Sequence, residues 1–244
     1  MATFRAAEID KVVADINARG FGLTFGLHTR IDNRVQEITD AIHVGNIYVN
    51  RNQIGAVVGS QPFGGEGLSG TGPKAGGPSY LPRFFAPAPG QAAPQRWAQD
   101  AAPHEVQAAL SQAAEIRLDE RLMPGPTGEL NRLSEVTRTP VLCLGPTAEV
   151  MNAQITAVEA LGGLAVPIAG KLSAKVLAGM KGFSAVLWWG DEEAGRAYAR
   201  ALASREGAIV PVLTALPDRA HVTHERHLCV DTTAAGGNAA LLAG

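Results

Sequence analysis

Residues 45–80 read GNIYVNRNQIGAVVGSQPFGGEGLSGTGPKAGGPSY, a short apolar strand followed by a long segment rich in glycine and proline. Ile47, Tyr48 and Val49 make up the strand, and the segment after them shows little periodicity. A loop of this length inside a compact domain is usually functional or disordered. We therefore expect the function of this part of the chain to lie in the loop.

Residues 6–50 predict two helix–strand units in front of that loop. The first helix ends at Gly20, where a left-handed cap suits glycine, and a strand over residues 23–29 follows. Asp32 is placed to cap the second helix. The apolar faces of the two helices are Ile9, Val12, Val13 and Ile16, and then Val35, Ile38, Ala41 and Ile42. This alternation favours an α/β sheet, parallel and covered on both faces.

The chain after the loop predicts a second α/β unit. Residues 82–94 are rich in proline and alanine and resemble a semi-rigid linker, while residues 104–122 predict an amphipathic helix. Apolar strands and helices then alternate as in a Rossmann-like domain, and residues 221–244 predict a strand and a glycine-containing tail. The predicted strands are 140–144, 164–168, 185–189 and 209–213, and the predicted helices are 147–161, 172–180 and 191–205.

The composition of the chain argues against several classes of protein. Its 244 residues carry a formal net charge of −2, which gives no electrostatic footprint for nucleic acid or an anionic membrane. No apolar run reaches the roughly 18–20 residues that span a bilayer, and the N-terminus lacks the pattern of a secretory signal. Cys143 and Cys229 lie in apolar, strand-like contexts, which argues against a disulfide framework and for a reducing cytoplasm.

Two glycine motifs resemble nucleotide-binding loops only on paper. Residues 65–70 match G-x-G-x-x-G, but residues 71–78 contain prolines and glycines that cannot begin the helix a dinucleotide site requires. Pro73 separates Gly72 from Lys74, so this tripeptide is no phosphate loop. The turn after the strand at 140–144 has one glycine, and we expect a Rossmann-shaped domain with an empty site there.

Histidines and cysteines near the C-terminus do not predict chemistry. His221, His224 and His227 are spaced so that three imidazoles converge fully neither on a helix nor on a strand, and no carboxylate pair completes a metal site. We expect surface or core histidines and no metal. Neither Cys143 nor Cys229 has the cationic neighbours that would make it a nucleophile, and Trp188 and Trp189 are expected to pack against flanking helices.

The pattern Pro62-Phe63-Gly64-Gly65 … Ser69-Gly70-x-Gly72 resembles the aldehyde dehydrogenases. The longer string from residue 45 to residue 77 resembles the glutamate-semialdehyde (pyrroline-5-carboxylate) dehydrogenase branch, above all bacterial bifunctional proline utilization A. The strings PGPTGE-x-N, VLCLGP, AVLWWGD and HERHLCVDTTAAGGNA resemble the extra C-terminal domain of the longer members of that family. The resemblance is weakest over residues 82–123.

The resemblance implies an α/β fold: a C-terminal piece of an aldehyde dehydrogenase catalytic domain followed by a Rossmann-like domain. Residues 1–85 would hold the substrate-anchor loop, and residues 86–123 would form a linker and a helix. Residues 124–244 would form a lid domain whose tail packs against the catalytic domain.

The resemblance also implies a substrate site at Gly55, Ala56 and Phe63. In the family, backbone N–H groups at the positions of Gly55 and Ala56 anchor the carboxylate of the semialdehyde, and the aromatic at Phe63 packs beside its aliphatic chain. The residue types suit this role, because small residues let the backbone approach an anion and consecutive amides can form an anion-binding nest. Without the resemblance, Phe63 would be taken as a core aromatic.

The family's catalytic groups have no counterpart in this sequence. The nucleophilic cysteine, the oxyanion-hole asparagine, the general-base glutamate, most NAD contacts and the proline dehydrogenase domain with its FAD would all lie upstream of position 1. We therefore expect no catalytic and no cofactor-binding residue here. The implied partners are glutamate semialdehyde and the remainder of the catalytic domain, with a homo-oligomer left open. The alternative is a non-catalytic Rossmann-like protein that binds a partner or a nucleotide through residues 135–230.

Overall fold

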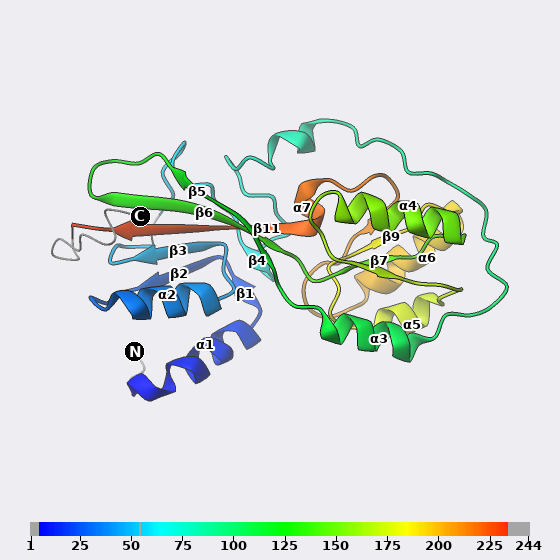
Figure 1. Ribbon diagram of the computed structural model, residues 1–244, viewed down its shortest axis with the longest axis horizontal. Coiled ribbons are helices and arrows are strands. Elements are labelled where there is room, and N and C mark those ends of the chain that lie inside the picture. Colours follow the sequence, from blue (N-terminus) through cyan, green and yellow to red (C-terminus); the bar gives the residue numbers. More distant parts are fainter. Residues whose placement is uncertain (1–4, 54, 234–244) are drawn as a thin grey trace. The chain divides into compact units, whose positions relative to one another are not determined.

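The computed structural model describes residues 5–53 and 55–233, which form two compact units. Unit 1 gathers the described residues of Met1–Tyr80, Asp119–Glu135 and Glu225–Gly244, and unit 2 consists of Leu81–Leu118 and Val136–His224. Each unit therefore combines segments that are far apart in the sequence (Figure 1). The division into segments 1–85, 86–123 and 124–244 as domains stays a prediction.

The main sheet of unit 1 has five strands in the order β2-β3-β11-β6-β5. Their bounds are Thr24–Leu27, Asn46–Val49, Thr223–Asp231, Glu129–Thr137 and Arg117–Met123. β2 and β11 both pair in parallel with β3, so residues near position 47 lie beside residues near position 228. The predicted strands before the loop and near the C-terminus are confirmed. The tail after residue 233 lies outside the described residues.

Helices α1 (Ile9–Ala18) and α2 (Asp32–Ala41) cover the apolar face of this sheet. The one-turn helix η1 (Ala6–Glu8) precedes α1. Gly20, just beyond the end of α1, has the positive φ of 73° expected of a glycine cap. The predicted cap at Asp32 is wrong: Ile31 occupies the N-cap position and Asp32 is the first helical residue. The Thr29 hydroxyl accepts a hydrogen bond from the Ile31 N–H at 3.2 Å and stabilises the entry to the helix.

Among its described residues, the glycine-rich segment contains one short strand and no regular helix before η2 (Leu81–Phe84). β4 (Glu66–Gly67) pairs antiparallel with β1 (Phe21–Gly22), which places Gly67 in a strand that is followed by a turn at residues 68–69. Among the described residues no helix follows the G-x-G-x-x-G glycines before η2, so the helix that a dinucleotide-binding loop requires is not present there.

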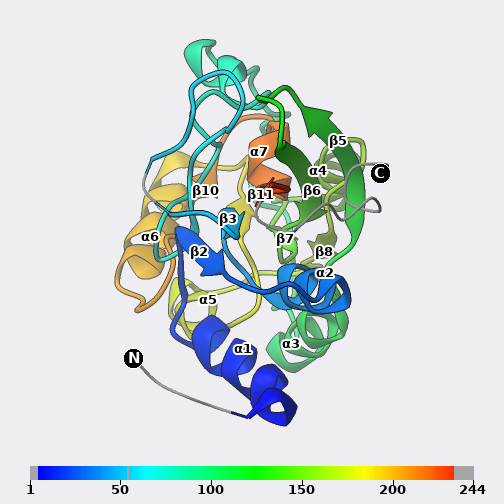
Figure 2. The same cartoon turned by 90° about the vertical axis from the view of Figure 1, so that its left-hand side faces the viewer.

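Unit 2 contains a parallel four-stranded sheet in the order β10-β9-β7-β8. The strands are Val212–Leu213, Ala185–Leu187, Val141–Cys143 and Ala165–Pro167. Its helices are α3 (Pro103–Gln112), α4 (Ala148–Glu159), α5 (Ala174–Gly179), α6 (Glu192–Ala203) and α7 (Arg219–Val222). Residues of α3, α5 and α6 pack on one face of the sheet, and residues of α4 and α7 on the other. Figure 2 shows α4 and α6 on opposite sides. The Rossmann-like prediction is therefore confirmed.

Tryptophans 188 and 189 follow β9 and divide between the two faces of that sheet. Trp188 is buried against α6, where its ring meets Tyr198 edge-on with centroids 5.3 Å apart. Trp189 packs with the residues of α4 on the other face. The expectation that both pack against flanking helices is confirmed.

The predicted helix over residues 104–122 is half wrong. α3 ends at Gln112, and Arg117–Met123 is the edge strand β5, which forms a hairpin with β6. The stretch is rich in Arg, Glu and Leu, all good helix formers, but its strand conformation is set by pairing with β6. Tertiary pairing thus overrides the local preference.

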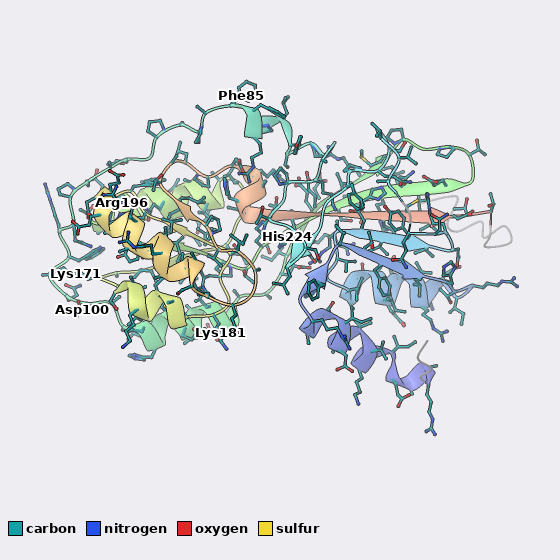
Figure 3. All side chains as sticks on the ribbon, turned by 180° about the vertical axis from the view of Figure 1, so that it is seen from behind. Phe85, Asp100, Lys171, Lys181, Arg196 and His224 are labelled. Carbon is teal, nitrogen blue, oxygen red and sulfur yellow. The ribbon has the colours of Figure 1, made fainter. Side chains whose placement is uncertain are left out.

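Residues 88–101 cross the carboxyl ends of the four strands of unit 2. Ala88 accepts a hydrogen bond from the Leu216 N–H beyond β10, and the Ala93 N–H bonds the Trp189 carbonyl beyond β9. The Arg96 N–H bonds the carbonyl of Pro146, beyond β7. Beyond β8, the backbones of Asp100 and Lys171 form an isolated parallel β-bridge, and these two residues lie side by side in Figure 3. The stretch predicted as a linker is thus hydrogen-bonded along one end of the sheet.

No helix within residues 5–53 and 55–233 is both long enough and apolar enough to cross a bilayer.

Gly45 is expected to tolerate no side chain. A Cβ added there would collide with the backbone carbonyl of Gly64, so Gly45→Ala should lower the free energy of unfolding by about 2–3 kcal/mol. Gly179 ends α5 with no atom within 4 Å of an added Cβ, so Gly179→Ala is the matched control and should be neutral or slightly stabilising. Urea unfolding of both variants measures the difference. Equal stabilities would contradict the close approach at Gly45.

Candidate functional site

The five-stranded sheet of unit 1 has one apolar and one polar face, and both are buried at its centre. Side chains alternate along a strand, and Ile47 and Leu228 belong to the apolar face that packs on the helices. Their neighbours Asn46, Tyr48, His227 and Cys229 occupy the other face and are 0% exposed. Parallel register places His227 beside Asn46 and Cys229 beside Tyr48. A buried polar layer thus lies where the glycine-rich segment meets the sheet.

Asn46 and Lys74 fix the backbone on both sides of Phe63. The Asn46 side-chain amide donates to the Pro62 carbonyl at 2.9 Å and accepts from the Gly64 N–H at 3.2 Å. The Lys74 Nζ donates to Asn46 Oδ1 at 2.8 Å and to the Gly64 carbonyl. Phe63 itself pairs with Ala75 through two backbone hydrogen bonds of 3.0 and 2.8 Å. The aromatic position therefore has little freedom.

Lys74 is a buried amine with a strongly lowered pKa. Its side chain is 3% exposed, and burial lowers its pKa to about 7 despite the opposing charges of Glu225 and Glu66. Glu225 accepts from the Lys74 backbone N–H at 3.2 Å and from the Ser79 N–H at 3.3 Å, so its carboxylate closes the turn that carries the lysine. The amine retains two acceptors in either protonation state.

Glu66 and Arg226 form a buried ion pair in the same unit. Arg226 Nη2 lies 3.1 Å from Glu66 Oε1, and the Arg226 Nε donates to the same oxygen at 3.2 Å. Both side chains are at most 10% exposed, and removing one partner of such a pair leaves an uncompensated buried charge. The pair ties β4 in the glycine-rich segment to β11.

His227 is the buried histidine of the three singled out in the sequence. Burial, followed by the charge of Lys74, lowers its pKa to about 4, so the imidazole is neutral at pH 7. His221 instead lies within α7, where its backbone N–H donates to the side chain of the N-cap residue Asp218 at 3.2 Å, and His224 lies half-buried in β11. Among the described residues, no group of three His, Cys, Asp or Glu side chains could hold a metal ion.

The predicted substrate residues lie in and beside a short segment, residues 55–60, that we call the anchor segment. Gly55 is exposed with φ 74°, and no atom lies within 4 Å of a Cβ added there. Ala56 and Phe63 are half-buried. Gln61, 3% exposed, follows the segment and accepts from the Val57 N–H at 3.1 Å through its side chain. Whether Gly55, Ala56 and Phe63 bind a substrate together stays a prediction.

Both cysteines are buried thiols. Burial raises the pKa of Cys143 and that of Cys229 to about 12 each, although the Arg51 side chain beside Cys229 acts in the opposite direction. A thiol with such a pKa is almost entirely protonated at neutral pH and is a poor nucleophile. This agrees with the expectation that neither cysteine acts in catalysis.

The turn after β7 in unit 2 is engaged by the chain's own residues. The Trp97 indole N–H donates to the Gly145 carbonyl at 2.6 Å, and a Cβ on Gly145 would collide with the start of α4. In Rossmann-like domains ligands bind outside the carboxyl ends of the strands. Residues 88–101 occupy that place along the whole sheet.

Several buried or half-buried polar residues near the glycine-rich segment belong to no local sequence pattern that predicts their role. Lys74 stands out in the sequence only within the tripeptide Gly72-Pro73-Lys74, which is no phosphate loop. Asn46 directly precedes the apolar strand residues 47–49 and matches no motif. The other residues passed over are Glu66, Glu129, Glu225 and Arg226. A charged residue inside a glycine-rich segment is usually solvated, whereas here these groups find partners that are far away in the sequence.

Comparison with known proteins agrees with this geometry. Residues 1–87 match the aldehyde dehydrogenase family. The matched residues include the anchor segment, Phe63 and Lys74.

Nearly the whole chain is similar to proteins named bifunctional protein PutA. It is 40% identical to the bifunctional protein PutA of Salmonella typhimurium over 96% of this chain and 22% of that protein. The 1-pyrroline-5-carboxylate dehydrogenase of Bacillus cereus is 43% identical over 33% of this chain and 16% of its own length. The chain thus spans about a fifth of the length of the PutA proteins it matches.

A solved structure supports the fold over most of the chain. Proline utilization A from Corynebacterium freiburgense superposes with a TM-score of 0.54 at 21% identity, covering 91% of this chain and 24% of that one. The α/β fold expected from the resemblance is thereby confirmed.

Lys74 should make stability depend on pH. Its pKa is about 7 in the folded chain and about 10.5 when unfolded, so between these values the unfolded chain binds a proton that the folded chain lacks. Stability contributed at this site therefore rises with pH. Relative to Lys74→Met, the unfolding free energy of the wild type should grow by about 1 kcal/mol per unit between pH 7.5 and 9.

Urea unfolding across that pH range measures the effect. Lys175→Met, at an exposed position on α5, is the control and should run parallel to the wild type. A constant difference between the wild type and Lys74→Met would show that the amine does not titrate there.

Proposed function

We propose that this chain supplies the substrate-anchoring part of an L-glutamate γ-semialdehyde dehydrogenase. The carrying observation is that its aldehyde dehydrogenase segment includes the anchor segment, in a chain similar to PutA over 96% of its length. Backbone N–H groups at Gly55 and Ala56 bind the substrate carboxylate, and Phe63 packs against the aliphatic carbons. The open backbone around Gly55 and the clamped backbone around Phe63 support these roles.

The chemistry belongs to groups outside these 244 residues. A covalent intermediate with an aldehyde needs a thiolate, and hydride transfer needs NAD beside it. In the proposed parent enzyme NAD serves this oxidation, and FAD serves an upstream oxidation of proline to pyrroline-5-carboxylate. The chain contributes recognition of the substrate and excludes water from one side of it.

Unit 2 is proposed to be a structural lid. The hydrogen bonds of residues 88–101 along the carboxyl ends of its strands favour this role over nucleotide binding. The same observation weighs against the alternative of a stand-alone protein that binds a nucleotide through residues 135–230. Cytoplasmic location, the remainder of a catalytic domain as partner and a homo-oligomer remain parts of the proposal.

Titration of the full-length chain with L-glutamate tests the anchor, because the product carries the same carboxylate as the semialdehyde. Amide resonances of Gly55 and Ala56 should shift and saturate in nuclear magnetic resonance spectra. Phe63→Ala should weaken binding about threefold to tenfold, since an aromatic contact contributes about 0.5–1.5 kcal/mol. Val58→Ala is the control because Val58 is 99% exposed. Shifts that avoid the anchor segment would overturn the proposal.

The chain by itself should not oxidise glutamate semialdehyde with NAD. Its two cysteines are buried thiols with pKa values of about 12, so the nucleophile is missing at neutral pH. NADH formation should stay at the rate of a no-protein blank. Turnover that disappears in the double variant Cys143→Ser/Cys229→Ser would contradict this expectation.

A further inference from the structure

The Glu129 carboxylate accepts hydrogen bonds from residues on both sides of the anchor segment. Glu129 Oε2 accepts from the Arg51 guanidinium at 2.6 Å, and Glu129 Oε1 accepts from the Gln61 amide at 2.7 Å. Arg51 precedes the anchor segment and Gln61 follows it. Glu129 begins β6, outside residues 1–87 that match the aldehyde dehydrogenase family.

Gln61 carries this restraint into the anchor segment. Its side-chain oxygen accepts from the Val57 N–H at 3.1 Å, while its own backbone N–H bonds the Val57 carbonyl at 2.9 Å. The amide group of Gln61 therefore has one end on Val57 and the other on Glu129. A shift of the carboxylate would release the side chain that holds Val57.

The surroundings of Glu129 favour a charged, fixed carboxylate. Its side chain is 15% exposed, and Asn131 donates to Oε1 at 2.8 Å. Burial acts to raise the pKa of Glu129, but hydrogen bonds from Asn131 and Gln61 and the charge of Arg51 outweigh it and lower the pKa. The Arg51 side chain also contacts Cys229 Sγ at 3.0 Å and lies over the Tyr48 ring. Hydrogen bonds to ionised groups are among the strong ones in proteins.

We propose that Glu129 is a positioning residue for substrate recognition: through Arg51 and Gln61 it holds the anchor segment in the conformation that presents its N–H groups to a carboxylate. This rests on the proposed function for the part that concerns substrate. It assigns to the β5–β6 hairpin a direct share in the affinity for the semialdehyde, in addition to completing the sheet.

Amide hydrogen exchange of the full-length chain tests the inference. Glu129→Gln keeps the shape of the side chain but removes its charge, so exchange at Val57 and Gln61 should accelerate about tenfold. Exchange in β7 should not change. Glu120→Gln is the matched control, because Glu120 lies on the same hairpin and pairs with Arg132 at 3.5 Å. Unchanged exchange in Glu129→Gln would overturn the inference.

Two further readouts separate positioning from general stability. In the wild type, exchange at Val57, corrected for its intrinsic pH dependence, should accelerate as acid protonates Glu129, and Glu129→Gln should lack this step. The wild-type profile decides the inference even where the variant fails to fold. Affinity for L-glutamate should fall about tenfold in Glu129→Gln and stay unchanged in Glu120→Gln.

The outcomes distinguish this inference from the proposed function. A wild-type chain that does not bind L-glutamate overturns the proposed function, while faster exchange in Glu129→Gln still supports Glu129 as the residue that orders the segment. A wild type that binds, with equal affinity and equal exchange in Glu129→Gln, sustains the function and overturns the positioning role.

Discussion

The parallel pairing of β3 with β11 is the constraint on which the rest of unit 1 depends. It brings together segments separated by about 180 residues, and it sets the register that places His227 beside Asn46. A slip of one residue would turn the polar side chains into the apolar core and the apolar side chains towards the glycine-rich segment. Neither the helices nor the anchor segment could then keep its position. The pairing thus determines both the core and the polar layer.

The buried charged groups near the glycine-rich segment carry a desolvation free energy that their hydrogen bonds and ion pairs must offset. Lys74, Glu225, Glu66 and Arg226 are all at most 9% exposed, and unpaired charges at such depth cost several kcal/mol each. Each of these groups is hydrogen-bonded to the backbone or ion-paired. Together these contacts specify one arrangement of the glycine-rich segment. An apolar layer of equal volume could be as stable, but it would not select a single backbone path.

The sequence predicted those parts of the fold that local patterns determine. Helix periodicity and short apolar strands located α1, α2 and the β–α alternation of unit 2, and the string at 45–80 carried the resemblance that led to Gly55, Ala56 and Phe63. The β5–β6 hairpin was missed because its first strand consists of good helix formers. The contacts of Glu129 were missed because 78 residues separate it from Arg51, and no local pattern encodes that distance.

Unit 2 shows why a Rossmann-like pattern alone does not predict nucleotide binding. The four parallel strands and their helices are present, but ligands of such domains bind outside the carboxyl ends of the strands. Residues 88–101 are hydrogen-bonded along that end of the sheet, and the Trp97 indole N–H donates to the Gly145 carbonyl in the turn after β7. Moving residues 88–101 away from the strand ends would break several hydrogen bonds at once. A stretch that composition marks as a spacer therefore covers the end of the sheet at which Rossmann-like domains bind their ligands.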